Sequence, residues 1–354
     1  KIILRPRPIK SFYEYFYGTL SMIPDKRQFL VIDQSSDSSV GILDSNFVSE
    51  HGRPGVKFIV RGSVWKISDI YSDKIYVNPS QDSTGAIPSW VGEEIPVPYE
   101  VAQEVGHIRH YIENALQKNK SEAEMAEILS RKYPIAKRYV QEAFREIIEQ
   151  YRRRYPVPTD QKVTIEEWED NLIIQCCFGS LVNRTLARIL GHLFSERLGQ
   201  VIAIQEDPYR IMIKKEGSLQ ANDLSQAISE LTPSEINKTV VDALIKTGLF
   251  KRRLVNIGIK FGAIKKWTDF SEFSLTQLIK SFEGTVIFNE AIRNSLEIDM
   301  DVKNLKAVLD KIREGKIEIV TIVSEGKIKT PSPIARIGVE RISWKTDLIP
   351  PEKI

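Results

Sequence analysis

The stretch KVTIEEWEDNLIIQCCFGSLVNRTLARILGHLFSERLGQVIAIQEDPYRIMIK, residues 162–214, decides the fold expected for this chain. Short apolar runs bounded by turn residues predict four strands, at Lys162–Glu167, Asn171–Phe178, Gln200–Gln205 and Tyr209–Lys214. Between the second and third strands, a turn at Gly179 leads into an amphipathic helix over Leu181–Leu198. This ββαββ order is typical of an α+β sheet domain.

Outside this stretch the periodicity changes twice. Helical patterns dominate residues 220–314, and Lys316–Val323 is expected to add a final strand. Residues 99–155 have a helical period and predict a bundle, in which one arrangement is a helix-turn-helix. Ser121 and Glu124 have the spacing of a capping box. The expected apolar stripe of the last helix consists of Ile135, Tyr139, Val140, Ala143, Phe144, Ile147 and Ile148.

The N-terminal part is rich in short β segments. The expected strands are Arg27–Asp33, Val40–Asp44, Lys57–Arg61, Val64–Ile70 and Lys74–Asn78. Such closely spaced segments predict a small β-barrel. The expected fold is therefore α+β: a small β-barrel with its lead-in at 1–98, a helical bundle at 99–155, and an α+β sheet domain with a helical C-terminal part at 156–354.

Composition limits the class of protein. The 354 residues are 42% hydrophobic and carry a net charge of only +3, so the position of each basic cluster is more informative than the total. Cys176 and Cys177 are adjacent and predict buried strand residues in a reducing, cytoplasmic compartment. No apolar run approaches the roughly 20 residues that span a bilayer. Because the first residue is Lys1, we expect a fragment of a longer protein or a processed product.

Several catalytic motifs are missing from the sequence. It contains no G-x-x-x-x-G-K-[ST] loop, no DEAD- or DEAH-type box and no H-E-x-x-H. The four histidines do not cluster with the cysteines, and His107 with His110 finds no acidic or cysteine partner at metal-site spacing. We therefore expect no catalytic residue, no metal site and no cofactor in this chain.

Short segments in order over residues 12 to 350 resemble the C-terminal region of Lhr-type helicases, a branch of helicase superfamily two, and an archaeal member is expected. The segments are Tyr17–Asp25, Val40–Val48, Gly62–Ile67, Pro88–Glu93, Pro156–Asp160, Phe178–Asn183, Leu249–Gly262, Leu305–Gly315 and Thr330–Ala335. From Pro156 onward they resemble the DEAD/H-associated domain of that family.

This resemblance implies an ATP-dependent helicase that moves 3′ to 5′ and acts in DNA repair or unwinding. Two RecA-like motor domains and a winged helix of the same protein would precede this segment, and the motor domains would bind ATP and Mg²⁺. The chain itself would be an accessory region over which single-stranded DNA or RNA passes. The DNA or RNA preference is left open.

Single-strand binding needs aromatic faces for bases and cations for phosphates. On the barrel, the resemblance makes Trp65 a base-stacking residue, with Arg61 and Lys66 beside it. The alternative is that Trp65 fills the core. Trp90, in a proline-flanked loop, is a second stacking residue or a lid over the barrel end.

Three further groups are expected to contact phosphates. Arg152, Arg153 and Arg154 end a helix, where they either hold phosphate or complement the helix dipole. Lys251, Arg252, Arg253 and Lys260 mark a basic helix that either binds or is simply solvated. Gly179, Asn183 and Arg184 form a helix start that either holds a phosphate or is a plain strand-to-helix turn, and Arg184 shares a face with Arg188.

Two other functions are open. The chain could be a protein-interaction module that docks a nuclease or another repair partner. It could also be a glycosylase-like base-processing domain, for which Glu206 or Asp207 would supply the carboxylate.

Overall fold

The computed structural model describes residues 13, 16–17, 28–44, 47–48, 52–81, 86–88, 95–214, 217–265, 272–322, 330–336 and 347–349. The chain forms two compact units, one of residues 1–93 with 251–291 and one of residues 94–250 with 292–354. Helices and two mixed sheets make up the described parts, which fits the expected α+β class. The domain boundaries expected from the sequence remain predictions.

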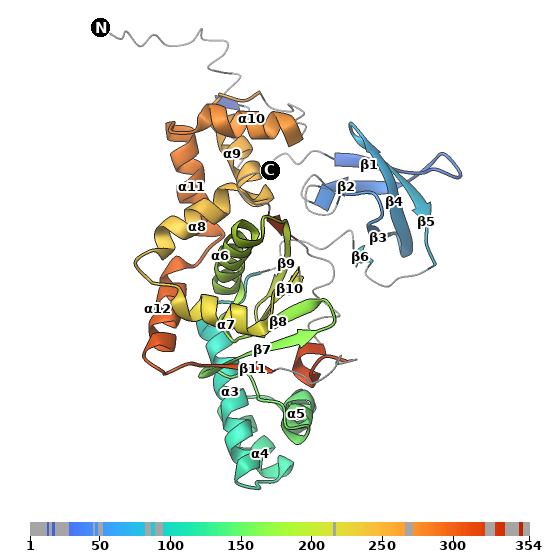
Figure 1. Cartoon of the computed structure of the whole chain (residues 1–354). Coiled ribbons are helices and arrows are strands. Elements are labelled where there is room, and N and C mark those ends of the chain that lie inside the picture. The colour runs from blue at the N-terminus through green and yellow to red at the C-terminus, as the bar shows by residue number, and fades with distance from the viewer. Residues whose placement is uncertain are drawn as a thin grey trace. The chain divides into compact units, whose positions relative to one another are not determined.

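The first sheet is a half-barrel (Figure 1). Its strands are β1 Gln28–Asp33, β2 Ser38–Asp44, β3 Lys57–Val60, β4 Ser63–Tyr71, β5 Lys74–Pro79 and β6 Ile87–Pro88, in the order β2-β1-β5-β4-β3-β6. The pairs β1/β5 and β3/β6 are parallel and the others antiparallel. Within the described residues β2 does not pair with β6, so the expected barrel is open rather than closed.

Alternating side chains of these strands form the interior of the half-barrel. The buried residues include Val31, Leu43, Phe47, Phe58, Ile67, Ile75 and Val77. The rings of Phe47 and Phe58 meet edge to face, with centroids 5.8 Å apart. Because one side of each strand faces this core, the sequence of this segment has the short apolar runs that predicted strands.

Three helices follow one another between residues 99 and 152: α3 Tyr99–Gln117, α4 Glu122–Lys132 and α5 Lys137–Arg152. The expected capping box is confirmed, because the Ser121 hydroxyl accepts from the Glu124 amide and the Glu124 carboxylate accepts from the Ser121 amide. The helices share a core of their own, made of Ile112, Ala115, Met125, Ala126, Leu129, Val140, Phe144, Ile147, Ile148, Val157 and Ile334.

The expected apolar stripe of α5 was too wide. Val140 and Phe144 are buried, as are Ile147 and Ile148. In contrast, the side chains of Ile135 and Tyr139 are 52% and 53% exposed. Residue 135 precedes the helix, which begins only at Lys137. The part of α5 that packs against the bundle is therefore narrower than its hydrophobic pattern.

The second sheet confirms the ββαββ expectation and extends it. Its strands are β7 Lys162–Trp168, β8 Asn171–Gln175, β9 Ile202–Asp207, β10 Arg210–Lys214, β11 Glu318–Ile322 and β12 Asp347–Ile349, in the order β11-β7-β8-β10-β9-β12. The expected strand at Lys316–Val323 is confirmed as β11, which pairs parallel with β7. The other neighbours are antiparallel.

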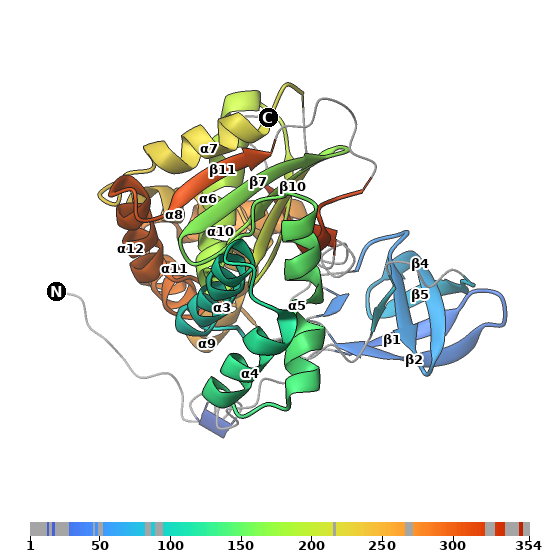
Figure 2. The same ribbon diagram turned by 90° about the horizontal axis from the view of Figure 1, so that it is seen from below.

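Helices cover one face of this sheet (Figures 1 and 2). Helix α6 Ser180–Leu198 lies against β9 and β10, and α7 Ala221–Glu230 lies against β7 and β11. Helices α8 Ile236–Ile245 and α12 Val302–Arg313 pack on α6. The remaining helices are α9 Gly248–Lys260, α10 Glu272–Phe282 and α11 Val286–Ile298. The expected dominance of helices between residues 220 and 314 is thus confirmed.

The other face of the second sheet holds a buried polar network. Glu166 of β7 is 2% exposed, and its carboxylate accepts hydrogen bonds from the Ser332 amide at 3.1 Å and from Gln175 Nε2 at 3.3 Å. Gln175 Nε2 also donates to Ser332 Oγ, and the Ile334 amide donates to Gln150 Oε1. These bonds hold residues 332–334 against the sheet and α5.

Glu166 forms no ion pair with the described residues, and burial raises the pKa of its carboxyl. A raised pKa means that the folded state favours protonated Glu166. Stability from this site is therefore complete below the unfolded pKa of about 4.3 and declines as the pH rises through the folded pKa. Gln175 Oε1, which has no partner among the described residues, offers an acceptor for an added N–H at this position.

Glu166→Gln is expected to stabilise the protein at pH 8 by on the order of 1 kcal/mol, since the amide cannot ionise and can donate to Gln175. The gain should shrink toward pH 4. Urea unfolding at the two pH values measures it, with Glu318→Gln on the exposed start of β11 as the matched control. A gain that is equal at both pH values would contradict the argument.

Candidate nucleic-acid interface

Trp65 lies at the margin of the half-barrel core. It pairs with Phe58 of β3 and with Pro79 of β5, and directly opposed residues share one face of a sheet. Trp65 is therefore on the same face as the buried Phe58 and Ile67. Its ring is half-buried, and its buried Nε1 meets no acceptor among the described residues. The side chain thus combines core packing with an exposed part, and base stacking stays a prediction.

The structure separates the two cations expected beside Trp65. Lys66 is exposed and points to the opposite face of the strand, as strand alternation requires. Arg61 and Gly62 form the two-residue turn between β3 and β4, with φ of 49° and 77°. Two positive φ values are typical of a type I′ hairpin turn, which leaves Arg61 exposed at its tip. Trp90 lies outside the described residues.

The arginine run is at the C-terminal end of α5. Arg152 and Arg153 are 69% and 51% exposed and pair with Glu122 and Glu149. Arg154 follows with φ of 60° and forms no ion pair with the described residues. Exposed ion pairs are worth only about 0–1 kcal/mol, so these arginines can exchange a carboxylate for a phosphate at little cost.

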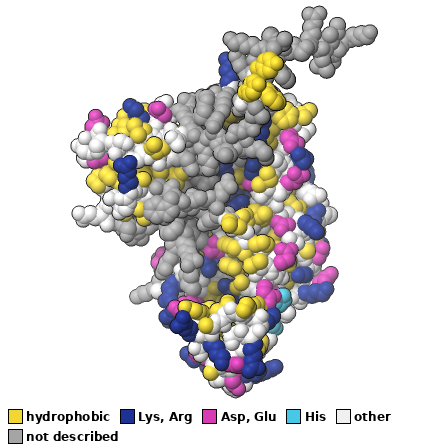
Figure 3. All heavy atoms as spheres, turned by 180° about the vertical axis from the view of Figure 1, so that it is seen from behind, with side chains coloured by type: hydrophobic (Ala, Val, Ile, Leu, Met, Phe, Trp, Pro, Cys, Tyr) yellow, Lys and Arg dark blue, Asp and Glu magenta, His cyan; other side chains and the backbone are white. Residues whose placement is uncertain are grey.

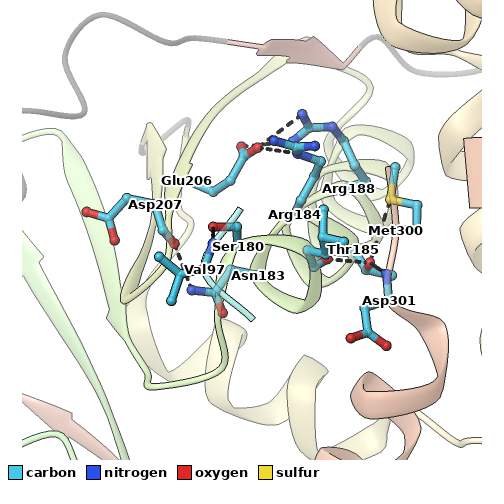
Figure 4. Close-up of polar contacts among 11 residues, drawn as sticks. Val97, Ser180, Asn183, Arg184, Thr185, Arg188, Glu206, Asp207, Met300 and Asp301 are labelled. Atoms are coloured by element: carbon cyan, nitrogen blue, oxygen red, sulfur yellow. Dashed lines mark hydrogen bonds and ion pairs between the residues drawn. The ribbon is translucent and has the colours of Figure 1, made fainter. Parts of the chain in front are cut away.

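The start of α6 is occupied by the protein's own groups (Figure 4). The Gly179 amide donates to the Pro208 carbonyl at 3.0 Å, and the Ser180 amide donates to the Val97 carbonyl at 2.9 Å. A Cβ at Gly179, where φ is 85°, would lie 2.7 Å from the Val97 oxygen. Glycine is needed here for this close approach.

Asn183 completes this junction from inside. It is fully buried, its Nδ2 donates to the Asp207 carbonyl at 2.8 Å, and its Oδ1 accepts from the Cys176 thiol at 3.2 Å. The Gly179 amide and the Asn183 side chain therefore form their hydrogen bonds within the fold. The contacts support the strand-to-helix turn rather than a phosphate site, and we assign neither residue a nucleic-acid contact.

Arg184 and Arg188 share a face of α6, as expected, and both bind Glu206 of β9 (Figure 4). Arg184 Nε lies 3.1 Å from one carboxylate oxygen, and Arg188 lies 3.0 Å from the other. Burial alone would raise the pKa of Glu206, but the two guanidinium groups outweigh it and hold that pKa at about 2. Arg188 is only 4% exposed, whereas Arg184 is 30% exposed at the edge of the pair.

The four cations of the basic helix are confirmed to lie on one helix, α9. Lys251, Arg252 and Arg253 are half-buried and Lys260 is exposed. Each of them takes part in at least one hydrogen bond, ion pair or other electrostatic contact. Their proposed phosphate contacts stay predictions.

The cysteines and histidines have structural contacts. Cys176 and Cys177 are free and fully buried, and burial raises the pKa of both thiols. His107 Nε2 lies 3.1 Å from the Asp160 carboxylate. Within the described ranges no three His, Cys, Asp or Glu side chains gather as metal ligands do. None of the helices searched there has the length and apolarity of a membrane span.

Arg138 and Tyr139, at the start of α5, form an exposed group that the sequence pattern did not indicate. Tyr139 was assigned to the buried stripe, and Arg138 was not singled out. A local charge count would have drawn attention to them, because residues 131–145 contain five Lys and Arg but one Glu and no Asp.

Glu206→Gln is expected to destabilise the fold by about 3 kcal/mol at pH 7, because it removes a charged carboxylate that pairs with the buried Arg188. The pKa of Glu206 is depressed in the folded state, so wild type keeps this stability above the unfolded pKa of about 4.3 and loses it toward pH 2. Chemical unfolding at pH 7 and pH 3 tests both statements. Glu297→Gln, which removes an exposed pair with Arg293, should change stability by less than about 1 kcal/mol.

The matches to curated relatives cover most of this chain but less than half of each relative. The chain is 25% identical to the ATP-dependent helicase Lhr-Core of Saccharolobus solfataricus, over 93% of this chain and 39% of the relative. It is 26% identical to the ATP-dependent helicase Lhr-Core protein 2 of Thermococcus barophilus, over 90% and 37%. The chain thus spans about two fifths of the length of these relatives.

A solved structure has a similar fold. It is the Mycobacterium smegmatis helicase Lhr bound to ssDNA and AMP-PNP, which matches with a TM-score of 0.53 and 19% sequence identity. The match covers 71% of this chain and 32% of the helicase.

A family model described as DEAD/H associated matches residues 157–335, which are 179 of the 354 residues. The match begins just before β7, includes α6 and all strands up to β11, and ends in the segment that Ser332 and Ile334 hold against the sheet. The family resemblance that the sequence indicated is confirmed, and this chain belongs to the DEAD/H associated family.

Proposed function

We propose that this chain is a non-motor accessory region of an Lhr-type ATP-dependent helicase, and that it grips and guides single-stranded nucleic acid during unwinding or repair. The observation that carries the proposal is the fold shared with the Lhr helicase that was solved bound to ssDNA. The family match and the Lhr-Core relatives agree with it.

The half-barrel would supply the stacking surface. The half-exposed ring of Trp65 is a sequence-independent platform for a base, and such stacking is worth about 1–3 kcal/mol. The edge of the indole that carries Nε1 is buried, so this part of the ring packs within the half-barrel. A ring that is partly anchored loses little side-chain freedom when a base stacks on its open part.

The end of α5 would supply phosphate contacts. Arg152, Arg153 and Arg154 are exposed, and the first two are held only by surface carboxylates. By contrast, Arg184 is paired with Glu206, so we propose that it contributes less to phosphate binding than the three arginines do. The contrast in burial is the reason for this ranking.

The chemistry of unwinding would come from elsewhere in the helicase. This sequence has no phosphate-binding loop, so ATP and Mg²⁺ would be bound by RecA-like motor domains, next to a winged helix, in the remaining three fifths of such a protein. DNA in an archaeal cell lies in the cytoplasm, and we place the activity there.

Nothing in the site favours base excision. Asp207 accepts from the Tyr209 amide and from Arg210 at 2.7 Å for both bonds, and Glu206 is paired with two arginines. A glycosylase carboxylate must face a base pocket, and these two carboxylates are engaged within the sheet and its turn.

Titration of the chain with single-stranded DNA at about 50 and 200 mM salt tests the proposal. Trp65→Leu, which keeps an apolar side chain in the core, should weaken binding by roughly 5- to 100-fold. Alanine at Arg152, Arg153 and Arg154 together should lower the log–log salt slope by about 2, since each single-strand phosphate contact adds about 0.7.

The matched control replaces three exposed cations on other helices, Lys238, Lys303 and Arg313, with alanine. Its salt slope should stay within about 0.5 of wild type. Thermal unfolding of every variant separates lost binding from lost folding. If wild type, Trp65→Leu and the arginine variant bind alike, these residues do not bind the single strand.

A further inference from the structure

Helices α4 and α5 form a compact two-helix motif on a rigid support. They are joined by the four residues 133–136. Helix α5 packs against α3 and α4, and the three helices share a core that includes Met125 and Phe144. In a helix-turn-helix, a short connection of this kind positions the second helix so that its outer face is presented to a partner.

The outer face of α5 is exposed and polar. Arg138, Gln141, Glu142 and Arg145 recur at spacings of three and four, opposite the buried Val140, Phe144, Ile147 and Ile148. Arginine and glutamine are the side chains that most often make paired hydrogen bonds to base edges in the major groove of DNA.

This part of the chain is strongly cationic. Residues 131–145 have five Lys and Arg against a single acid, Glu142, in a protein whose net charge is only +3. Figure 3 shows Lys and Arg side chains gathered on the lower lobe, which helices α3–α5 form. Arg131 and Lys137 share the one carboxylate of Glu127, and Lys132 pairs with Glu104.

Two cations of this face have no comparable partner. Arg138 forms no ion pair with the described residues, and Arg145 is 70% exposed and 3.9 Å from Glu146. Helix stability does not explain the arrangement, because α5 has no acid in its first turn and its dipole disfavours cations there. An anionic partner explains it better than solvent does.

Tyr139 restricts the orientation of the Arg138 side chain. The Arg138 guanidinium lies 4.6 Å from the centroid of the Tyr139 ring and donates to its hydroxyl at 2.9 Å. A stacked guanidinium keeps its planar fork of donors in one orientation and loses less freedom on binding. The adjacent Ile135, 52% exposed, adds an apolar contact of the kind that fits a thymine methyl or a sugar.

We propose that α4 and α5 are a helix-turn-helix that contacts a B-form DNA duplex, with α5 in the major groove and with Arg138 and Arg145 as its principal contacts. The groove of B-form DNA admits a helix, whereas the deep and narrow major groove of A-form RNA does not. This site is additional to the single-strand grip and does not rest on it.

The test uses the whole chain and two probes of one sequence, a blunt DNA duplex of about 20 base pairs and its single strand. Arg138→Glu with Arg145→Glu should weaken duplex binding at least about tenfold and leave single-strand binding within about twofold of wild type. Arg138→Gln with Arg145→Gln should lower the duplex salt slope by about 2, since each duplex contact adds about 0.9.

The control for charge is Lys238→Glu with Lys303→Glu, which makes the same change in net charge at exposed positions of α8 and α12. It should leave duplex binding within about twofold of wild type. The proposal is overturned if wild type does not bind the duplex, if both charge-reversal variants weaken it equally, or if duplex and single-strand binding fall together. An equal loss on an RNA duplex of the same sequence would also overturn it.

Discussion

The packing of helix α6 on the apolar face of the second sheet is the interaction on which most of this structure depends. Leu186, Ile189 and Leu190 are buried against strands β7–β10 and helices α7, α8 and α12, and each such side chain contributes roughly 1.5–3 kcal/mol. The helix begins directly after Gly179, whose backbone lies against Val97. The same contact therefore also determines where the chain enters α3.

Burial divides the arginines of this unit into two kinds. Arg188 is almost inaccessible to solvent and pairs with Glu206, so its charge contributes to the stability of the fold. Arg152, Arg153 and Arg145 are exposed, and their carboxylate partners hold them weakly. A protein with little net charge can still present cationic surfaces, because its acidic side chains are unevenly distributed among the basic ones.

The two proposed contacts suit different forms of nucleic acid. A half-exposed indole on a strand has room for a flipped or unpaired base, whereas an exposed polar helix face matches the width of a duplex groove. A helicase substrate contains both forms at once. The buried network around Glu166 holds residues 332–334 on the opposite face of the sheet from α6 and ties them to α5 through Gln150.

The sequence by itself determined the ββαββ order, the capping box at Ser121, the turn at Gly179 and the common face of Arg184 and Arg188, because each depends on local spacing alone. Only the tertiary structure decided that β11 joins β7 across about 150 residues, that the half-barrel stays open, and that Glu206 neutralises Arg188. Tyr139 shows the physical reason: its place in an apolar period was read correctly, but exposure depends on whether a distant element covers it.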